Sequence, residues 1–233
     1  MRTPRHFRLL IAGLFLACVH GTASAAPEPL TCGDGKNEST ALKTAPHGAT
    51  RASPHVLTVK YQGGEKRFED QPPFQEAFGG AHWYYCGYVP ALRAHLVGKN
   101  EKALFSGVLL LDDTGQVVDA GQGLYPSPDG KSFLAIRQEQ GKEDSLWLVA
   151  ERSGKTLWDG YAALFRMVVE KPGRKLVSEV DTWYKDPFWT EGGVLQATAV
   201  CNPPGTEGIG NLVSDGGTWR WQTNVHCTPP RGR

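Results

Sequence analysis

Residues 105–119 read FSGVLLLDDTGQVVD, and this stretch decides the fold. It consists of an apolar run, a polar turn and a second, shorter apolar run. Phe105 to Leu111 predicts a strand, because seven residues without a charge end at a cluster of turn-forming residues. Asp112-Asp113-Thr114-Gly115 supplies the turn, and Gln116 to Asp119 predicts the partner strand. We therefore expect an antiparallel β-meander from Leu104 onwards.

Apolar runs of strand length, each bounded by turn residues, recur outward from this hairpin. Val56 to Tyr61 alternates and is closed by Gly63-Gly64. Gly205 to Gly217 predicts a Gly-rich loop before a last strand, in which Trp219 and Trp221 share one face. The remaining predicted strands are Ser132–Gln138, Ser145–Glu151, Thr156–Trp158, Val194–Val200 and Trp219–Val225.

Pro172-Gly173 predicts the most clearly specified hairpin in the chain. Pro fixes the first central residue of a type II turn, and Gly tolerates the positive φ of the second. Folding about this turn places Val169 opposite Leu176 and Glu170 opposite Lys175. The register set by the turn therefore places apolar residues opposite apolar residues and opposite charges opposite each other.

One short helix is predicted near Pro90 to Val97. Pro90 suits the first helical position, Leu92 and Leu96 have i, i+4 spacing, and Gly98 suits a C-terminal stop. The predicted fold is therefore mainly β, an antiparallel meander of propeller-like or sandwich-like sheets with one short helix and two disulfides.

Four short motifs follow one another within residues 107–160. They are Val108-Leu109-Leu110-Leu111, Ser127-Pro128-Asp129-Gly130-Lys131, Ser145-Leu146-Trp147-Leu148-Val149 and Ser153-Gly154-Lys155. This stretch resembles one blade of a TolB-like or prolyl-oligopeptidase-like β-propeller. The resemblance implies a scaffold commonly used for protein binding and implies no active site. Because the chain is too short for more than about four blades, we expect propeller-like sheets rather than a closed ring.

Residues 1–25 have the pattern of a cleavable export signal. Three arginines precede the apolar run from Leu9 to Val19, and Ala23-Ser24-Ala25 offers the small residues of a cleavage site. Cleavage of 25 residues from the 233 leaves 208, in which residues 26–53 predict an extended arm and residues 54–233 one β-rich domain. We expect a periplasmic or secreted protein. An alternative cleavage before Cys18 would leave a lipid anchor at that cysteine.

The cysteines of the mature chain predict a disulfide framework, as is usual for exported proteins. Three pairings are open to Cys32, Cys86, Cys201 and Cys227. The favoured one joins Cys32 to Cys86 and Cys201 to Cys227, because each bond then closes a loop of moderate length. No pair has the C-x-x-C spacing of a zinc or redox site.

The net charge and the absence of known catalytic motifs limit the classes of function that the sequence supports. The whole chain has 25 basic and 24 acidic residues, and the signal contains three of the basic ones, so the mature balance is 22 against 24. A near-neutral chain argues against nucleic-acid binding, and no second apolar stretch predicts a transmembrane segment. We find no signature of a catalytic nucleophile, metal site or cofactor loop. We therefore assign no catalytic residue, metal or cofactor.

Clustered aromatic residues are the remaining functional signal, because Trp and Tyr are favoured at binding surfaces. The candidate binding residues are Trp83, Tyr84, Tyr85, Trp183 and Trp189. The expected function is a non-catalytic binding protein of the bacterial periplasm with a protein partner in the cell envelope, such as an inhibitor or immunity-type protein that neutralises an enzyme or toxin. The alternative is a secreted hydrolase or glycan-binding protein that acts on cell-wall material.

Overall fold

A computed structural model describes residues 28–32, 35–74, 79–101, 104–138, 145–160, 182–201 and 205–227. Two predictions lie outside these ranges. One is the export signal with its alternative lipidation at Cys18, and the other is the hairpin around Pro172-Gly173.

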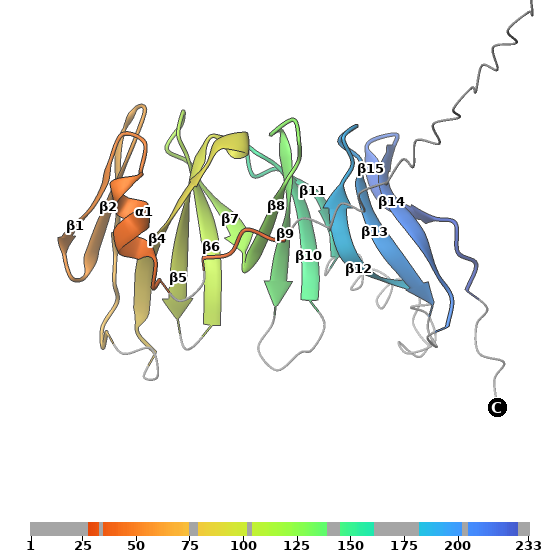
Figure 1. Cartoon of the computed structure of the whole chain (residues 1–233), viewed down its shortest axis with the longest axis horizontal. Coiled ribbons are helices and arrows are strands. Elements are labelled where there is room, and N and C mark those ends of the chain that lie inside the picture. The colour runs from red at the N-terminus through yellow and green to blue at the C-terminus, as the bar shows by residue number, and fades with distance from the viewer. Residues whose placement is uncertain are drawn as a thin grey trace, which may run out of the picture.

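Four antiparallel sheets follow one another along the chain and lie side by side in a row, with the first and last at opposite ends (Figure 1). The first sheet has three strands, β1 (Ala49–Ser53), β2 (Val56–Tyr61) and β3 (Gly64–Glu69). The second has four strands, β4 (Ala81–Val89), β5 (Ala94–Glu101), β6 (Leu104–Leu111) and β7 (Val117–Gly121).

The third and fourth sheets repeat the four-stranded arrangement of the second. The third consists of β8 (Gly123–Pro126), β9 (Ser132–Gln138), β10 (Ser145–Glu151) and β11 (Thr156–Asp159). The fourth consists of β12 (Thr182–Trp189), β13 (Leu195–Cys201), β14 (Glu207–Asp215) and β15 (Thr218–Thr223). Strands adjacent in sequence are also adjacent in each sheet, so the predicted antiparallel meander is confirmed.

Hydrophobic cores fill the space between successive sheets. In the second sheet, Leu109 and Leu111 pack toward the third sheet, whereas Leu110 packs toward the first. In the third sheet, Leu134 packs toward the fourth sheet and its neighbour Phe133 toward the second. Because successive side chains of a strand point to opposite faces, a sheet packed on both sides needs an uninterrupted apolar run. The row of sheets thus explains the Val-Leu-Leu-Leu sequence of β6.

The predicted helix near Pro90 to Val97 is wrong. Pro90–Leu92 forms only a 3₁₀ turn, and β5 begins at Ala94. Arg93 between them is left-handed, with φ 47°. Leu92 packs from the turn and Leu96 from the strand into the same core, so their helical spacing arises from two different elements.

The helix of the described chain lies instead in the segment expected to be an extended arm. α1 (Glu38–Lys43) and β1 both fall within residues 26–53. Ala41 and Leu42 of α1 pack against the core between the first two sheets. Tertiary packing therefore stabilises a helix too short to be stable alone.

The Gly-rich loop predicted at Gly205–Gly217 is also wrong, because most of this segment is β14. A Cβ atom on Gly208 would lie 2.2 Å from Val225, and one on Gly210 would lie 2.7 Å from the ring of Tyr184. These glycines therefore allow close packing on the inner face of the strand rather than marking a loop.

Both disulfides join the cysteines that were predicted to pair. The Cα atoms of Cys32 and Cys86 are 5.1 Å apart, and those of Cys201 and Cys227 are 5.3 Å apart. The arm is therefore pinned by Cys32 as expected. Leu30 pairs with Leu124 of β8, so the arm also crosses from the second sheet to the third.

Candidate functional site

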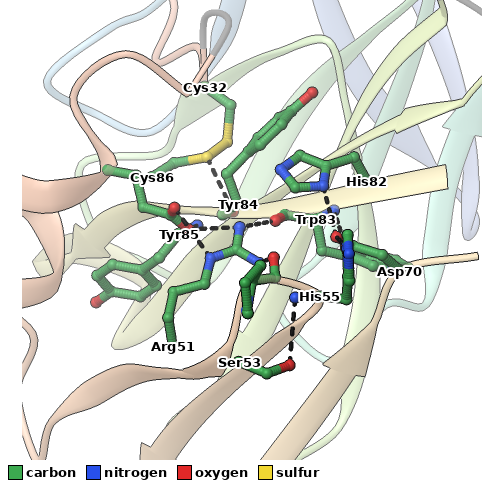
Figure 2. Close-up of polar contacts among 12 residues, drawn as sticks. Cys32, Arg51, Ser53, His55, Asp70, His82, Trp83, Tyr84, Tyr85 and Cys86 are labelled. Atoms are coloured by element: carbon green, nitrogen blue, oxygen red, sulfur yellow. Dashed lines mark hydrogen bonds and ion pairs between the residues drawn. A yellow bond between two sulfur atoms is a disulfide. The ribbon is translucent and has the colours of Figure 1, made fainter. Parts of the chain in front are cut away.

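Three of the five candidate aromatics are consecutive in β4, and the strand divides them between its two faces. Tyr84 and Tyr85 are both buried, and Figure 2 shows their rings pointing away from each other. Trp83 is half-buried; its ring lies 5.1 Å from that of Phe68, and the Lys99 ammonium lies 5.5 Å from its centroid. The structure therefore places the two tyrosines in the interior and leaves part of Trp83 accessible.

The other two candidates lie on opposite faces of β12. Trp189 packs in the core between the third and fourth sheets, and its indole N–H donates to the carbonyl of Tyr125 at 2.9 Å. Trp183 is 43% exposed, with the Lys185 ammonium 5.9 Å from its ring centroid. The five predicted residues do not form one surface, since β4 and β12 belong to the second and fourth sheets.

A buried carboxylate organises the surface beside β4, a feature that the sequence analysis missed. Asp70 accepts a hydrogen bond from the Trp83 amide at 2.9 Å, and its other oxygen lies 2.5 Å from Nδ1 of His82 (Figure 2). Nδ1 of His55 lies 3.4 Å from that same oxygen. The carboxylate itself is fully buried, whereas both imidazoles are partly exposed. Asp70, which follows β3 of the first sheet, thus connects that sheet to β4 and contacts two surface histidines.

Arg51 and Glu38 form a second polar link between the first two sheets. The guanidinium contacts both oxygens of Glu38, at 3.0 and 3.1 Å, and also donates to the Trp83 carbonyl. Glu38 in turn accepts the Tyr85 amide at 2.8 Å. Since both side chains are about four-fifths buried, this link fixes α1 and β1 against β4.

A third polar group lies in the interior, where Tyr85 meets His95. The Tyr85 hydroxyl is 2.9 Å from Nδ1 of the fully buried His95. Among the described residues, Nε2 of His95 meets no hydrogen-bond partner, and it lies 3.6 Å from Asp112. Burial lowers the pKa of His95, and the nearby Asp112 carboxylate opposes that shift only in part. Burial also raises the pKa of Tyr85, with further contributions from Tyr88 and Asp112. The directions of both shifts favour the uncharged forms of His95 and Tyr85, which join β5 to β4.

Within the described ranges, no three His, Cys, Asp or Glu side chains gather as a metal site would require. A Ser-His-Asp set of Ser106, His82 and Asp112 can be drawn from the sequence, but His82 contacts Asp70 instead. The structure therefore places His82 beside a different carboxylate from the one in that set.

The two ends of the row differ in the chemistry of their outer faces. On the first sheet, Thr58 is opposite Arg67 and Lys60 is opposite Glu65, so the outer face is polar and charged. On the fourth sheet, Trp183 and Ile209 point outward, because their cross-strand partners alternate with those that pack in the core. Ile209 is 51% exposed. Among the described residues of these two faces, the exposed large apolar side chains lie on the fourth sheet.

Polar side chains surround these apolar residues on the outer face of β12–β15. Gln196 donates to Asn211 at 2.7 Å across β13 and β14. Lys185 pairs with Glu207 at 2.7 Å, and an exposed valine, Val194, immediately precedes β13. We call the outward-facing residues of this sheet the terminal face. They are Trp183, Lys185, Phe188, Gln196, Thr198, Val200, Glu207, Ile209, Asn211, Val213, Asp215, Thr218, Arg220 and Gln222, and Val200 is buried among them.

The sequence analysis found one residue of the terminal face, Trp183, and missed the rest. Ile209 and Val213 were assigned to a loop because glycines surround them. Strict alternation was the available signal, since Gly208, Gly210 and Leu212 point inward while Ile209, Asn211 and Val213 point outward.

Comparison with known protein families, curated proteins and solved structures finds no match. Among the helices of the described residues, none combines the length and apolar character needed to cross a bilayer. The two disulfides are compatible with an oxidising, extracytoplasmic location.

Proposed function

We propose that this protein is an exported, non-catalytic binding protein of the bacterial cell envelope that docks a protein partner on its terminal face. An inhibitor or immunity-type protein is the form of this function that we favour. The single observation that carries the proposal is the exposure of Trp183 and Ile209 at one end of the row, whereas the opposite end is charged.

The sheet-on-sheet packing inside the chain supports a partner that itself presents a β-sheet. Each internal sheet buries both faces against its neighbours, whereas the outer face of the fourth sheet leaves Trp183 and Ile209 exposed and buries Val200, the cross-strand partner of Trp183. A partner that offers an apolar β-sheet face would pack on the terminal face as the next sheet in the row. The spacing of about 10 Å between packed sheets would then bury Trp183 and Ile209 at the centre of the contact.

The composition of the terminal face suits such an interface. Trp is enriched among residues that dominate binding energy, and its truncation at an interface centre typically costs about 2 kcal/mol or more. Burying the exposed half of Ile209 adds about 1 kcal/mol. The Gln196–Asn211 and Lys185–Glu207 pairs provide fixed hydrogen-bonding groups around this apolar centre.

Export supports the same proposal. The residue pattern of 1–25 predicts passage out of the cytoplasm, and the disulfides are compatible with it. We infer a periplasmic location, where a small protein pinned by disulfides could neutralise an enzyme or toxin.

The test uses the mature protein as bait in periplasmic extract, beside two variants. The double variant Trp183→Ala with Ile209→Ala alters the terminal face. The matched control, Thr58→Ala with Arg67→Ala, alters the outer face of the first sheet. We expect the wild type and the control to retain the same protein. The terminal-face variant should bind that purified protein at least about thirtyfold more weakly, which corresponds to a loss of about 2 kcal/mol.

Two outcomes would overturn the proposal. One is equal retention of the partner by the terminal-face variant and the control. The other is a bait that forms a dimer in light scattering and becomes monomeric in the terminal-face variant, because the face would then be occupied by a second copy of this chain.

A further inference from the structure

A hollow of about 420 Å³ opens at the edge of the second sheet, beside the third. Its volume falls within the range of small-molecule sites, about 300–1,000 Å³. The side chains used below are Glu101, Leu104, Ser106, Asp119 and Arg137. None of them belongs to the terminal face, so the hollow is separate from the proposed docking surface.

The strand register brings the polar groups of the second sheet to one face. Glu101 of β5 is opposite Leu104 of β6, and Asp119 of β7 is opposite Val108 of β6. Leu104, Ser106 and Val108 alternate along β6 and therefore point the same way. Two carboxylates and a hydroxyl thus share one side of the sheet, with the apolar Leu104 between them.

Arg137 of β9 completes the hollow from the third sheet. Its guanidinium lies 3.0 Å from Asp119 and 3.4 Å from Asp159. The other oxygen of Asp119 accepts the amide of Gly121 at 3.0 Å. Both charged side chains are thereby held in position before any ligand arrives, which lowers the entropic cost of binding.

The lining chemistry selects among ligand classes. Glu101 and Asp119 only accept hydrogen bonds when ionised, whereas Arg137 only donates. A hydroxyl group both donates and accepts, so vicinal hydroxyls match a lining that mixes the two kinds of group. Each carboxylate of the lining already pairs with a cation, Glu101 with Lys99 at 2.5 Å and Asp119 with Arg137 at 3.0 Å. The lining therefore has no unbalanced charge that would select a charged ligand over a neutral one.

We propose that this hollow binds a neutral, polyhydroxylated ligand, that is, a saccharide. The carboxylates of Glu101 and Asp119 accept from ligand hydroxyls, and Arg137 donates to them. Leu104, on the same face as these polar groups, contacts the apolar C–H groups of the sugar ring. The proposal concerns binding alone and includes no cleavage of a glycosidic bond.

The test is a titration of the ¹⁵N-labelled mature protein with chitotriose and with maltotriose, followed by NMR. We expect saturable shifts of the amides of Ser106, Gly121 and Gln122 with at least one of these trisaccharides. Two variants, Arg137→Gln and Asp119→Asn, should each weaken that binding about tenfold. The matched control Arg220→Gln removes an exposed arginine that pairs with Asp215 on the fourth sheet, and it should leave the affinity unchanged.

The spectra of the variants report whether the fold is intact, and Asp119→Asn preserves the shape of the side chain. Absence of saturable shifts with both trisaccharides would overturn the proposal. Saturable binding of the diamine putrescine in their place would also overturn it, because the hollow would then be a cation site. The terminal-face variant should bind the trisaccharide normally, so failure of this proposal and failure of the proposed docking function are separate results.

Discussion

Replacing Asp70 with alanine should destabilise the protein by about 3–5 kcal/mol. The carboxylate is fully buried, accepts the Trp83 amide at 2.9 Å and contacts the His82 ring at 2.5 Å. A hydrogen bond to a charged group contributes about 1.5–3 kcal/mol, so two such bonds account for most of this loss. The contact with His55 is 3.4 Å long and adds little. Alanine would also leave the half-buried Trp83 amide without its acceptor.

Urea unfolding followed by tryptophan fluorescence measures this change. Asp70→Asn keeps one oxygen for the Trp83 amide and should lose about half as much stability. The control Asp215→Ala breaks an exposed ion pair with Arg220 and should change the free energy of unfolding by less than about 0.5 kcal/mol. The reasoning is refuted if Asp70→Ala costs less than about 1 kcal/mol, or if Asp70→Asn is as damaging as Asp70→Ala.

Three further predictions concern stability. Burial lowers the pKa of His95 below its ordinary value of 6.5, so the unfolded chain binds a proton that the folded chain does not, and stability should fall as the pH drops below 6.5. Unfolding curves of His95→Gln should show a shallower pH dependence, by at most about 1.4 kcal/mol per pH unit. Replacing Cys201 and Cys227 with serine removes a bond across 26 residues and should cost about 3–4 kcal/mol in urea unfolding. In Gly210→Ala the new methyl group would lie 2.7 Å from Tyr184, and thermal unfolding should report a loss of about 1–3 kcal/mol.

Each of these predictions has its own control. An unchanged pH profile in His95→Gln would show that another group titrates on unfolding. The serine variants are compared with the reduced wild type, and equal stability of the oxidised and reduced wild type would contradict the role of the bond. Gly192→Ala places its methyl group 3.9 Å from the nearest atom and should be neutral. If it is as damaging as Gly210→Ala, close packing against Tyr184 is not the cause.

Strands were predictable where an apolar run ends at turn residues. The ranges Val56–Tyr61, Ser132–Gln138 and Ser145–Glu151 coincide with β2, β9 and β10. The pairing of the cysteines was also predictable, since each bond joins neighbours in sequence. In these cases local sequence and tertiary packing favour the same conformation.

Prediction failed where tertiary packing overrides local pattern. The spacing of Leu92 and Leu96 mimics a helix because a 3₁₀ turn and a strand fill one core. β14 reads as a loop because its inner positions are glycines that admit Tyr184 and Val225. α1 could not be predicted because its sequence has no apolar periodicity. Contacts with β4 and β1 stabilise this helix instead.

The candidate site was only partly accessible to sequence reasoning. Aromatic clustering identified Trp183, but composition alone could not distinguish it from Tyr84, Tyr85 and Trp189, which the structure places largely in the interior. The exposure of Trp183 depends on the position of its sheet at the end of the row, which is a property of the whole fold. The role of Asp70 depends on contacts across 12 to 15 residues and likewise could not be read from local pattern.

Site-specific photo-cross-linking tests the proposed docking on the terminal face most directly. Ile209 and, separately, Thr58 would each be replaced by p-benzoylphenylalanine in the native cells. Irradiation should give one discrete adduct with a protein partner from position 209 and none from position 58. Absence of an adduct at 209, or the same adduct from both positions, would contradict the account.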